Sequence, residues 1–418
     1  MPDDKLWKTN RLICGDNLDE LSKLDKESVD LIYIDPPFWT NRQYEVIWGD
    51  EAEVRSFEDR WEGGIEHYID WMRPRIEEMY RVLKQTGSIY LHCDWHATHH
   101  LRLLLDKIFG TKHFINEIIW DYGARATVRR SGFPRKHDTI LFYAKSDTYS
   151  FHPLYKPYKD LEMKRYNKLD SKGKRYALIK RRRTDGSIYY GKCYPREGAP
   201  ETDVWQISLM SSTSKERLGY PTQKPEALLE KIIKASSDKN DVILDAFCGC
   251  GTALAVAQKQ GRNWIGIDIS PTAIKLVERR LHKSGAVKGV NYNAVGMPTT
   301  EKDLRELKPF EFQNWVIDEM RAIQSRKKSG DMGLDGYYSH SIFTEPAGIQ
   351  VKQSENIGRN TIDNFETALR REKYNKGFIV AFSFGKGAYE EASRAKNKEG
   401  VNIELIKIED LLRKRFRV

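Results

Sequence analysis

Short apolar runs of strand length alternate with helical patterns over much of the chain, and this alternation constrains the fold more than any other feature of the sequence. The runs predicted as strands lie at 29–34, 87–92, 242–244 and 264–267. Helical patterns such as 68–83 and 101–109 separate them. Strands that alternate with helices are typical of a parallel sheet covered by helices on both faces. The sequence therefore predicts an α/β fold for residues 1–150 and 220–285.

Composition excludes several classes of protein. Hydrophobic residues make up 39% of the 418 residues, which is enough to close a core and argues against wholesale disorder. No apolar run approaches the roughly 18 residues of a membrane-spanning helix, and residues 1–5 lack the apolar region of a secretory signal. The five cysteines are scattered and odd in number, so they indicate neither a disulfide framework nor a paired zinc motif. We expect a protein of the reducing cytoplasm.

The rest of the chain divides into an insert, a linker and a second domain. Residues 151–219 interrupt the alternation, and the window 151–220 holds 16 Lys and Arg against 8 Asp and Glu, with eight tyrosines. Cations interleaved with aromatic rings suit the phosphates and unstacked bases of DNA. The Gly- and Pro-containing segment 286–308 is predicted to be a linker. A second α/β pattern follows over 309–418, with helices at 309–325 and 360–372 and strands near 337–344, 347–353 and 377–382.

A glycine-rich turn follows the predicted strand 242–244. Gly249 and Gly251 lie between this strand and a predicted helix 253–260, so a ligand could approach the backbone closely. Asp268 ends the next strand, where a carboxylate can accept both hydroxyls of a ribose. The third glycine of a dinucleotide motif is replaced by Leu254, so a ribose without a pyrophosphate fits better. The alternative is a plain strand-to-helix turn with a capping Asp.

The tetrapeptide Asp35-Pro36-Pro37-Phe38 directly follows the predicted strand 29–34. Two prolines hold φ near −65° and remove two backbone donors, so the turn presents the Asp35 carboxylate and the Pro36 carbonyl as acceptors. Phe38 would project outward beside them. Open α/β sheets bind ligands at the carboxyl ends of their strands. The turn is therefore predicted to cradle a planar aromatic amine, with a rigid structural turn as the alternative.

These two motifs, in this order, resemble the DNA amino-methyltransferases of the β class. The resemblance covers roughly residues 8–285 and includes 221–225, just before the glycine turn. It implies a seven-stranded Rossmann-like fold, S-adenosylmethionine as cofactor, and Asp35, Pro36, Pro37 and Phe38 as catalytic residues. Gly15-Asp16 would touch the cofactor adenine, Asp268 its ribose, and 221–225 its methionine end. The full set of cofactor-binding residues that the resemblance implies is Asp16, Thr222, Lys224, Asp245, Phe247, Gly249, Gly251, Thr252 and Asp268.

The acceptors of the tetrapeptide suggest a mechanism. An exocyclic amine conjugated to its ring is a poor nucleophile, and hydrogen bonds to Asp35 and Pro36 would aim its lone pair at the sulfonium methyl. The base must leave the duplex to reach them, and Phe38 would stack on it. In the family an Asp as the first letter usually accompanies adenine-N6 chemistry and a Ser cytosine-N4 chemistry. Asp35 therefore favours adenine, while the same acceptors would also serve cytosine.

Two further clusters have competing interpretations. The run Arg181, Arg182 and Arg183 is either a solvated charge run or, within the basic insert, a contact to DNA phosphates. His92-Cys93-Asp94 with the neighbouring histidines could suggest a metal. We favour the rim of the base pocket or helix capping there, because the residues end a strand and spread around a helix start.

The C-terminal pattern contains a possible metal-dependent site. Gln350 and Lys352 are two apart in a predicted strand and share a face, and Asp335 at the start of the preceding strand could meet them. The segment resembles the Mrr-type restriction endonuclease domain, in which Gln replaces the middle acid of the nuclease motif. Asp335 would then be a Mg²⁺ ligand. The Gln removes one charge from the site, so a nuclease-like fold that only binds DNA remains an alternative.

The sequence thus favours a site-specific adenine-N6 methyltransferase of double-stranded DNA with a methylation-linked nuclease domain, from a prokaryotic or phage restriction-modification system. The alternatives are a cytosine-N4 methyltransferase, a nuclease whose methyltransferase half recognises the site, and a non-catalytic DNA-binding protein. A homodimer is a family-level expectation.

Overall fold

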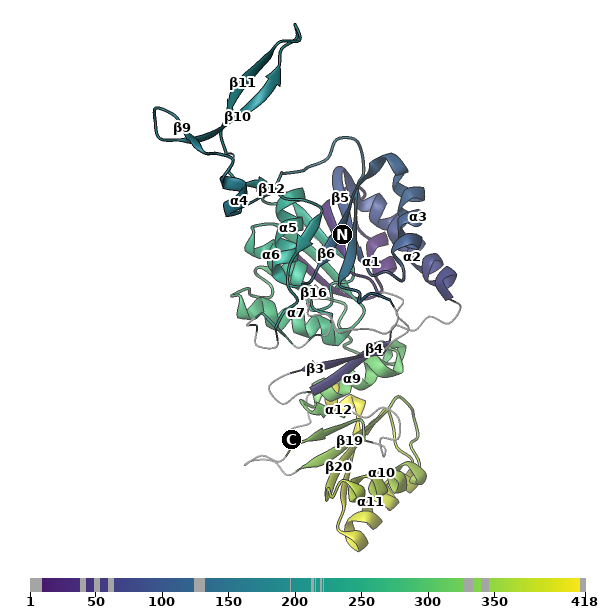
Figure 1. Ribbon diagram of the computed structural model, residues 1–418. Helices are drawn as coiled ribbons and strands as arrows, with labels where there is room; N and C mark the ends of the chain where they lie inside the picture. The colour runs from purple at the N-terminus through teal and green to yellow at the C-terminus, as the bar shows by residue number, and fades with distance from the viewer. Residues whose placement is uncertain are drawn as a thin grey trace.

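The structure is a computed structural model, shown in Figure 1. The residues that it describes are 10–37, 43–48, 53–58, 64–123, 132–195, 197–211, 214, 216–218, 220, 222–325, 334–339 and 346–413. None of the helices in these ranges has the length and apolarity needed to cross a membrane.

A nine-stranded sheet forms the centre of the larger unit, in the order β13-β6-β7-β5-β2-β14-β15-β1-β16. All its strands run parallel except β7, which is antiparallel to β5 and β6. The strands are β1 (Asn10–Cys14), β2 (Val29–Ile34), β5 (Leu83–Cys93), β6 (Phe114–Asp121), β7 (His137–Ala144), β13 (Val204–Gln206), β14 (Val242–Asp245), β15 (Asn263–Asp268) and β16 (Tyr292–Val295). The predicted α/β sheet is present.

Helices cover both faces of this sheet, as the alternation of strands and helices predicts. One face packs against α1 (Asn17–Ser22), α2 (Gly64–Val82) and α3 (Thr98–Phe109). The other face packs against α5 (Glu226–Ser236), α6 (Thr252–Lys259) and α7 (Pro271–Lys283). Because both faces are buried, the central strands read as continuous apolar runs.

Two predicted boundaries differ from the structure. The central seven strands correspond to the expected sheet, and β13 and β16 extend its two edges. β13 comes from the expected insert and pairs with β6, and β16 comes from the expected linker and pairs with β1. Both strands have four residues or fewer and are only partly buried, so their sequences carry little strand pattern. The segment 286–308 is therefore folded and includes α8 (Glu301–Glu306).

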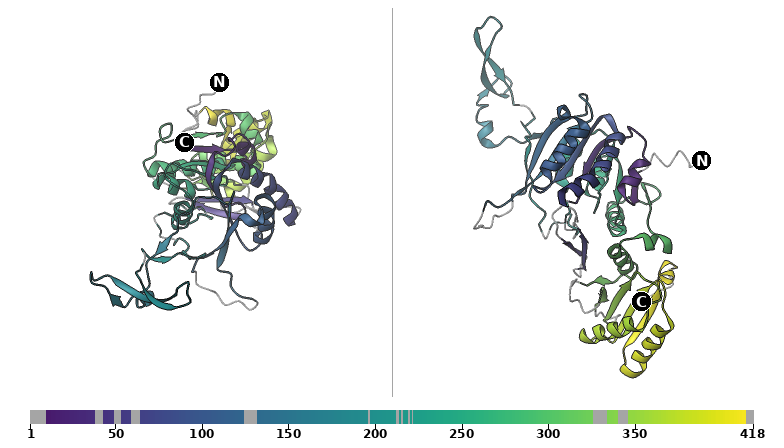
Figure 2. Two further views of the ribbon diagram at one scale, coloured as in Figure 1. Left: turned by 90° about the horizontal axis from the view of Figure 1, so that it is seen from above. Right: turned by 90° about the vertical axis from the view of Figure 1, so that its right-hand side faces the viewer.

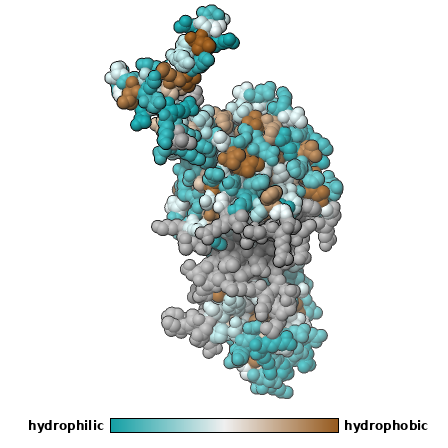
Figure 3. All heavy atoms as spheres, in the orientation of Figure 1, coloured by the Kyte–Doolittle hydropathy of each residue, from teal (hydrophilic) through white to brown (hydrophobic). Residues whose placement is uncertain are grey.

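The part of the insert 151–219 that contains β9 (Lys168–Leu169), β10 (Arg175–Arg182) and β11 (Ile188–Cys193) projects away from the central sheet as an arm (Figures 1 and 2). Its long hairpin consists of β10 and β11. The shorter elements near its base are β8 (Tyr155–Lys156), α4 (Asp160–Met163) and β12 (Ala199–Pro200). In Figure 3 apolar side chains lie among hydrophilic ones along the arm, and Leu178, Ile188 and Tyr190 are exposed there.

A second, five-stranded sheet forms the C-terminal unit, in the order β17-β18-β19-β20-β21. Its strands are β17 (Ile323–Gln324), β18 (Gly336–Tyr338), β19 (Ala347–Lys352), β20 (Lys376–Ala381) and β21 (Asn402–Lys407). One core packs α8, α9 (Pro309–Glu319) and α12 (Ile408–Leu412) against the sheet, and another packs α10 (Arg359–Arg371) and α11 (Lys386–Glu399).

The C-terminal elements differ from the prediction mainly in length. The helix predicted over 309–325 ends at Glu319, because Arg321 adopts a positive φ of 55° and the chain turns into β17. The strand predicted near 337–344 is β18, which is shorter, and residues 340–345 lie outside the described residues. A further hairpin, β3 (Gln43–Trp48) and β4 (Glu53–Glu58), follows the tetrapeptide, and β4 lies against β17.

Candidate active site

The two motifs predicted to form the site lie on neighbouring strands. The turn beginning at Asp35 follows β2, and the glycine turn follows β14, which pairs directly with β2. Parallel strands place their carboxyl ends at the same edge of a sheet, so the topology brings the motifs together. Phe38 lies outside the described residues, whereas Asp35, Pro36 and Pro37 are described.

The Asp35 carboxylate is held on one side only. Lys224 donates a hydrogen bond from Nζ to Asp35 Oδ2 and another to the carbonyl of Thr222, at 3.2 Å. No described residue donates a hydrogen bond to the buried Asp35 Oδ1. A buried acceptor of this kind is costly unless a donor reaches it. Lys224 was expected at the methionine end of the cofactor, and the structure brings it to Asp35.

A buried histidine lies behind Asp35. His92 Nδ1 is 3.8 Å from Asp35 Oδ1 and 3.0 Å from the Tyr33 hydroxyl, and Nε2 is 3.2 Å from Asp138 Oδ2. Tyr122 also donates to Asp138, at 2.8 Å. The side chain of His92 is fully buried. His92 was expected at the rim of the base pocket or in helix capping, and this chain of polar groups was not expected.

Two of these polar groups, Asp138 and Tyr33, have shifted pKa values. Burial acts to raise the pKa of Asp138, but the interactions with His92, then the charge of Lys224 and the hydrogen bond from Tyr122, outweigh it and lower the pKa. Burial, and next the charge of Asp35, raises the pKa of Tyr33 well above its usual value. Asp138 is therefore ionised and Tyr33 keeps its proton. An ionised Asp138 accepts the hydrogen bond from His92 Nε2.

The glycine turn requires glycine at two positions. Gly249 and Gly251 have φ values of 47° and 70°, which disfavour residues with a side chain. A Cβ on Gly249 would lie 3.2 Å from the Tyr220 ring, and one on Gly251 would lie 2.9 Å from Val277. Asp245 at the end of β14 is buried, and burial together with the charges of Asp35 and Asp268 raises its pKa. The backbone N–H of Phe247 donates to Asp245 Oδ1 at 3.2 Å.

Asp268 joins the glycine turn to the start of α7. Its Oδ2 accepts the Gly249 N–H at 2.8 Å, and its Oδ1 accepts the Ser270 N–H at 2.9 Å. Burial raises the pKa of this carboxyl, while the two N–H bonds act to lower it. Each oxygen has a second acceptor position, so the carboxylate can also receive ribose hydroxyls.

Asp16 and Thr252, also predicted to bind cofactor, make other contacts. Asp16 caps α1 and forms an ion pair of 2.8 Å with Arg75, whose guanidinium lies 3.9 Å from the centre of the Trp71 ring. The Thr252 hydroxyl accepts from Arg280 at 3.0 Å. The structure brings Gly15 rather than the Asp16 side chain to Asp268, through the Gly15 N–H and the Asp268 carbonyl at 3.0 Å.

The three arginines of the insert lie on both faces of the arm. In the hairpin, Lys180 faces Tyr190, Arg181 faces Tyr189 and Arg182 faces Ile188. Successive residues of a strand alternate between faces, so Arg182 shares a face with Lys180 and Tyr190. Arg181 lies over Gly191 on the other face, and the Arg183 guanidinium lies 5.1 Å from the centre of the Tyr189 ring. All three arginines are exposed.

The predicted nuclease residues meet at the β18–β19 pair. Asp335 immediately precedes β18, and its Oδ2 accepts the Val351 N–H at 2.7 Å. Gln350 and Lys352 flank Val351 on β19, with Gln350 buried and Lys352 partly exposed. The structure thus brings Asp335 beside the Gln350–Lys352 segment.

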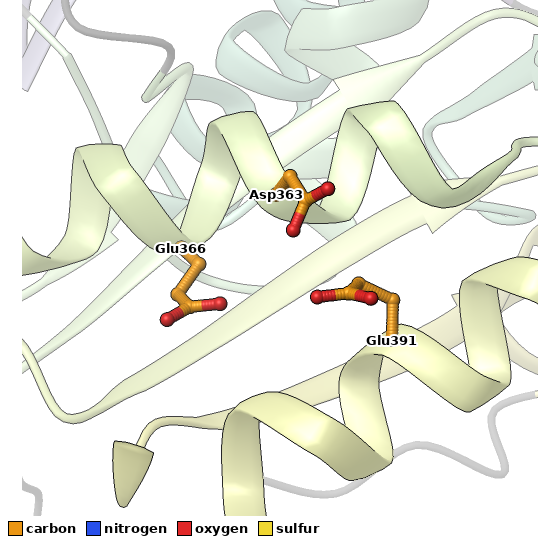
Figure 4. A group of neighbouring side chains, drawn as sticks. All are labelled: Asp363, Glu366 and Glu391. Atoms are coloured by element: carbon orange, nitrogen blue, oxygen red, sulfur yellow. The ribbon is translucent and has the colours of Figure 1, made fainter. Parts of the chain in front are cut away.

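A separate cluster of carboxylates in the C-terminal unit is neutralised by arginines. Asp363 and Glu366 on α10 point toward Glu391 on α11 (Figure 4). Arg394 pairs with all three carboxylates, Arg370 with Glu366 at 2.6 Å, and Arg359 with Glu391 at 2.8 Å. This network holds α10 against α11, and its charge does not require a metal. Among the described residues it is the one carboxylate, histidine and cysteine group with metal-ligand spacing, so His92 and Asp94 do not belong to such a group.

The sheet carries an acceptor-rich turn, a glycine turn and the Asp268 carboxylate at one edge. This arrangement is typical of enzymes that bind a nucleoside cofactor. Comparison with protein families matches residues 29–279 to the DNA methylase family and residues 304–414 to a restriction endonuclease family. The chain belongs to the DNA methylase family and carries a restriction endonuclease domain at its C-terminal side.

Two individual relatives agree with this family. The chain is similar to DNA adenine methyltransferase YhdJ of Escherichia coli (strain K12), with 32% identity over 65% of this chain and 82% of the relative. It is also similar to Type II methyltransferase M.HpaI of Haemophilus parainfluenzae, with 30% identity over 65% of this chain and 74% of the relative. Among solved structures, the cytosine-N4-specific PvuII DNA methyltransferase matches 65% of this chain and 86% of its own, with 16% identity and a TM-score of 0.44.

Proposed function

We propose that this chain transfers a methyl group from S-adenosylmethionine to the N6 of a flipped-out adenine in double-stranded DNA. The observation that carries the proposal is the Asp35 carboxylate, which Lys224 fixes through Oδ2 while no described residue donates to Oδ1. This acceptor follows β2 at the same sheet edge as the glycine turn. An amine proton from a substrate base is a donor of the type that Oδ1 lacks.

The residues of the glycine turn fit the cofactor. The Asp268 carboxylate retains acceptor positions for ribose hydroxyls. Gly249 has a positive φ that suits the turn, and its missing side chain leaves room for the Tyr220 ring. S-adenosylmethionine would supply an electrophilic methyl group. Asp35 and the Pro36 carbonyl would accept the two amine protons and direct the nitrogen lone pair toward that methyl. As the N–C bond forms and the S–C bond breaks, the nitrogen gains positive charge, and Asp35 would stabilise it until one proton leaves.

Adenine is the proposed base because the motif begins with Asp35 and because the relative YhdJ is named a DNA adenine methyltransferase. Cytosine-N4 is the alternative that the same acceptors allow. The arm is the proposed DNA contact, through Arg181, Arg182 and Arg183 and the neighbouring tyrosines. We place the enzyme in the cytoplasm of a prokaryote or in a phage-infected cell, and a homodimer remains a family-based proposal.

We propose a domain organisation that keeps most of the expected boundaries. Residues 1–150 and 220–285 would form the methyltransferase domain, 151–219 the target-recognition insert and 309–418 the nuclease-like domain. The segment 286–308 would connect them, with β16 assigned to the methyltransferase sheet and α8 to the C-terminal core.

A second activity, DNA cleavage, is supported by the C-terminal site. Asp335 is anchored on the Val351 N–H, between Gln350 and Lys352. A carboxylate, an amide oxygen and a lysine are groups that can hold a divalent cation and orient a water. Mg²⁺ would then be bound by Asp335, with Lys352 beside it.

Incubating the protein with methyl-labelled S-adenosylmethionine and DNA, without and with Mg²⁺, tests both activities. The methyltransferase proposal predicts label in the DNA without Mg²⁺, and the nuclease proposal predicts cleavage only with Mg²⁺. Cleavage without label would favour a nuclease whose methyltransferase half recognises the site. If neither labelled nor cleaved DNA is detected, a non-catalytic DNA-binding protein is the remaining alternative.

A further inference from the structure

Helix α9 of the C-terminal unit has two different faces. Phe312 and Val316 are fully buried in the core of that unit. Glu311, Asp318 and Glu319 follow the spacing i, i+7 and i+8 and therefore share another face. This acidic stripe (Glu311, Asp318 and Glu319) is directed at a helix of the methyltransferase sheet.

The acidic stripe meets the beginning of α7. The Ser270 hydroxyl lies 3.0 Å from Glu311 Oε2, the Thr272 hydroxyl donates to Asp318 at 3.0 Å, and Lys275 donates to Glu319 at 2.7 Å. The amino end of a helix carries a partial positive charge, so acidic groups are favourable there. The contacts are polar, as is common at interfaces between domains that move relative to each other.

One of these contacts leads directly to the cofactor site. Ser270 uses its hydroxyl on Glu311 and its backbone N–H on Asp268, and Asp268 in turn holds the Gly249 N–H. A continuous chain of hydrogen bonds therefore runs from α9 through the ribose-facing carboxylate to the glycine turn. The environment of Glu311 agrees with this path, because burial and next the charge of Asp268 raise its pKa, against the Ser270 hydrogen bond.

The C-terminal unit also touches the chain beyond the other motif. The β3–β4 hairpin follows the tetrapeptide in sequence, and β4 lies against β17 of the C-terminal sheet. In Figure 1 the hairpin and α9 both lie at the junction between the two sheets. The C-terminal unit thus contacts an element that follows the catalytic turn and an element that follows Asp268.

We propose that Glu311 is a positioning residue of the cofactor site, which acts through Ser270 on Asp268 and so couples cofactor binding to docking of the nuclease-like domain. The inference rests on the proposed cofactor site. Binding energies coupled in this way are reciprocal, so the bound cofactor must favour docking of α9 to the same extent that docking favours the cofactor. The nuclease-like domain would then sense whether the methyltransferase holds its cofactor.

Calorimetric titration of the full chain with S-adenosylhomocysteine tests the first half of this coupling. Glu311→Ala should weaken binding by about fivefold or more, the lower end of typical coupling effects. Glu311→Gln keeps an acceptor for Ser270 and should restore most of the affinity. Glu319→Ala is the matched control, since it breaks an ion pair of the same interface without reaching Ser270 or Asp268, and its effect should be smaller.

A double-mutant cycle separates positioning from a general loss of stability. Ser270→Ala removes the hydroxyl and keeps the N–H on Asp268. The double variant combines Glu311→Ala with Ser270→Ala. If Glu311 acts through Ser270, the affinity of this variant for S-adenosylhomocysteine should be no lower than that of the single variant with the lower affinity. Additive losses would show that Glu311 acts by another route and would overturn the proposal.

Hydrogen exchange of α9 tests the reciprocal half. S-adenosylhomocysteine should slow exchange over 309–319 in the parent protein, and this effect should be lost in Glu311→Ala. Two results would contradict the coupling: equal affinity for S-adenosylhomocysteine in the parent and Glu311→Ala, or hydrogen exchange in α9 that the ligand does not change. If the parent still binds the ligand and methylates DNA, either result would overturn this inference alone. A parent protein that does not bind the ligand would overturn the proposed function as well.

Discussion

The ion pair between Lys224 and Asp35 is the feature of this site that differs most from its expected form. The two residues are 189 positions apart in the chain, so their contact was not predicted from the sequence. The resemblance places Lys224 at the cofactor, whereas the structure places its ammonium group on the Asp35 carboxylate, which is predicted to be catalytic. The two roles predict different effects of replacing Lys224. A lysine that fixes Asp35 affects the transferring step, and one that holds the cofactor affects binding.

Replacing Lys224 with Met should lower the single-turnover rate of methyl transfer by about 10²-fold, as when a preorganised electrostatic group is removed. The dissociation constant for S-adenosylmethionine should change little. Lys231→Met is the control, because Lys231 is a partly buried lysine on α5 that pairs with Glu201 at 2.8 Å. A raised dissociation constant with an unchanged rate would return Lys224 to the methionine end of the cofactor.

The residues at strand ends were predictable from sequence, and the groups behind them were not. Asp35 and Asp268 follow short apolar runs, so strand prediction alone places them at one sheet edge. The contact of His92 with Tyr33 depends on the register in which Tyr33 pairs with Tyr90, which sequence does not specify. The Lys224–Asp35 pair likewise depends on how a segment after the insert returns to the sheet.

At the scale of elements, the β10–β11 hairpin divides the arginine run between two faces. Lys180 and Arg182 share a face with the exposed Tyr190. Arg181 and Arg183 lie against residues of the hairpin itself. A two-stranded ribbon fits the major groove of DNA, with one face toward the bases and backbone. The three arginines should therefore contribute unequally to DNA binding.

Two double variants of equal charge loss test this division. Lys180→Ala with Arg182→Ala should weaken DNA binding and reduce the slope of log affinity against log salt by about 0.9 for each lost phosphate contact. Arg181→Ala with Arg183→Ala should change the slope less. Filter binding or fluorescence anisotropy over a series of salt concentrations measures both. Unchanged slopes in both variants would mean that the arm does not contact phosphates.

The predicted elements are correct where they are long and apolar, and incomplete at the edges of the sheet. α9 was expected to run to 325, but Arg321 in a left-handed conformation ends it, and no Gly or Pro marks the place. β13 and β16 were missed because their registers are fixed by β6 and β1 rather than by their own composition. Short edge strands depend on tertiary pairing more than on local propensity.

The α7–α9 interface should respond to pH through Glu311. Burial, and next the charge of Asp268, raises the pKa of Glu311 to about 7 from an ordinary value of 4.5. Its contribution to stability is therefore fully present below pH 4.5 and is lost as the pH rises through about 7. The other titratable and charged groups that interact with Glu311 are Cys14, Tyr220, Asp268, Lys308 and Asp318.

Thermal unfolding of the parent and of Glu311→Gln over this pH range isolates the contribution of Glu311. The parent should lose stability relative to the variant as the pH rises, because only the parent gains a buried charge. Both proteins share the other titrating groups, so the difference between their melting temperatures reports Glu311. A difference that does not vary with pH would contradict the environment assigned to this carboxylate.

At the scale of the whole molecule, a DNA methylase and a domain that matches a restriction endonuclease family are joined in one chain. If the C-terminal unit cuts DNA, cleavage should require Mg²⁺ or Mn²⁺ and should disappear in both Asp335→Ala and Lys352→Ala. Asp335 supplies the charged metal ligand, and Lys352 orients water and offsets charge on the phosphate. Methyl transfer should persist in both variants, which provides the folding control.

The nuclease assay should use unmethylated, half-methylated and fully methylated forms of one DNA, since a domain fused to a methyltransferase is expected to depend on methylation state. No metal-dependent cleavage of any form would leave residues 309–418 as a DNA-binding unit. Cleavage that survives Asp335→Ala would come from another site.

The most direct test of the central claim identifies the methylated nucleoside. DNA treated with the protein and S-adenosylmethionine is digested to nucleosides and analysed by mass spectrometry, in parallel for the parent and for Asp35→Ala. The parent should produce N6-methyladenine, and the variant should produce none while still binding S-adenosylhomocysteine. N4-methylcytosine as the product would contradict the assignment of the base, and equal yields from the two proteins would contradict the assignment of Asp35.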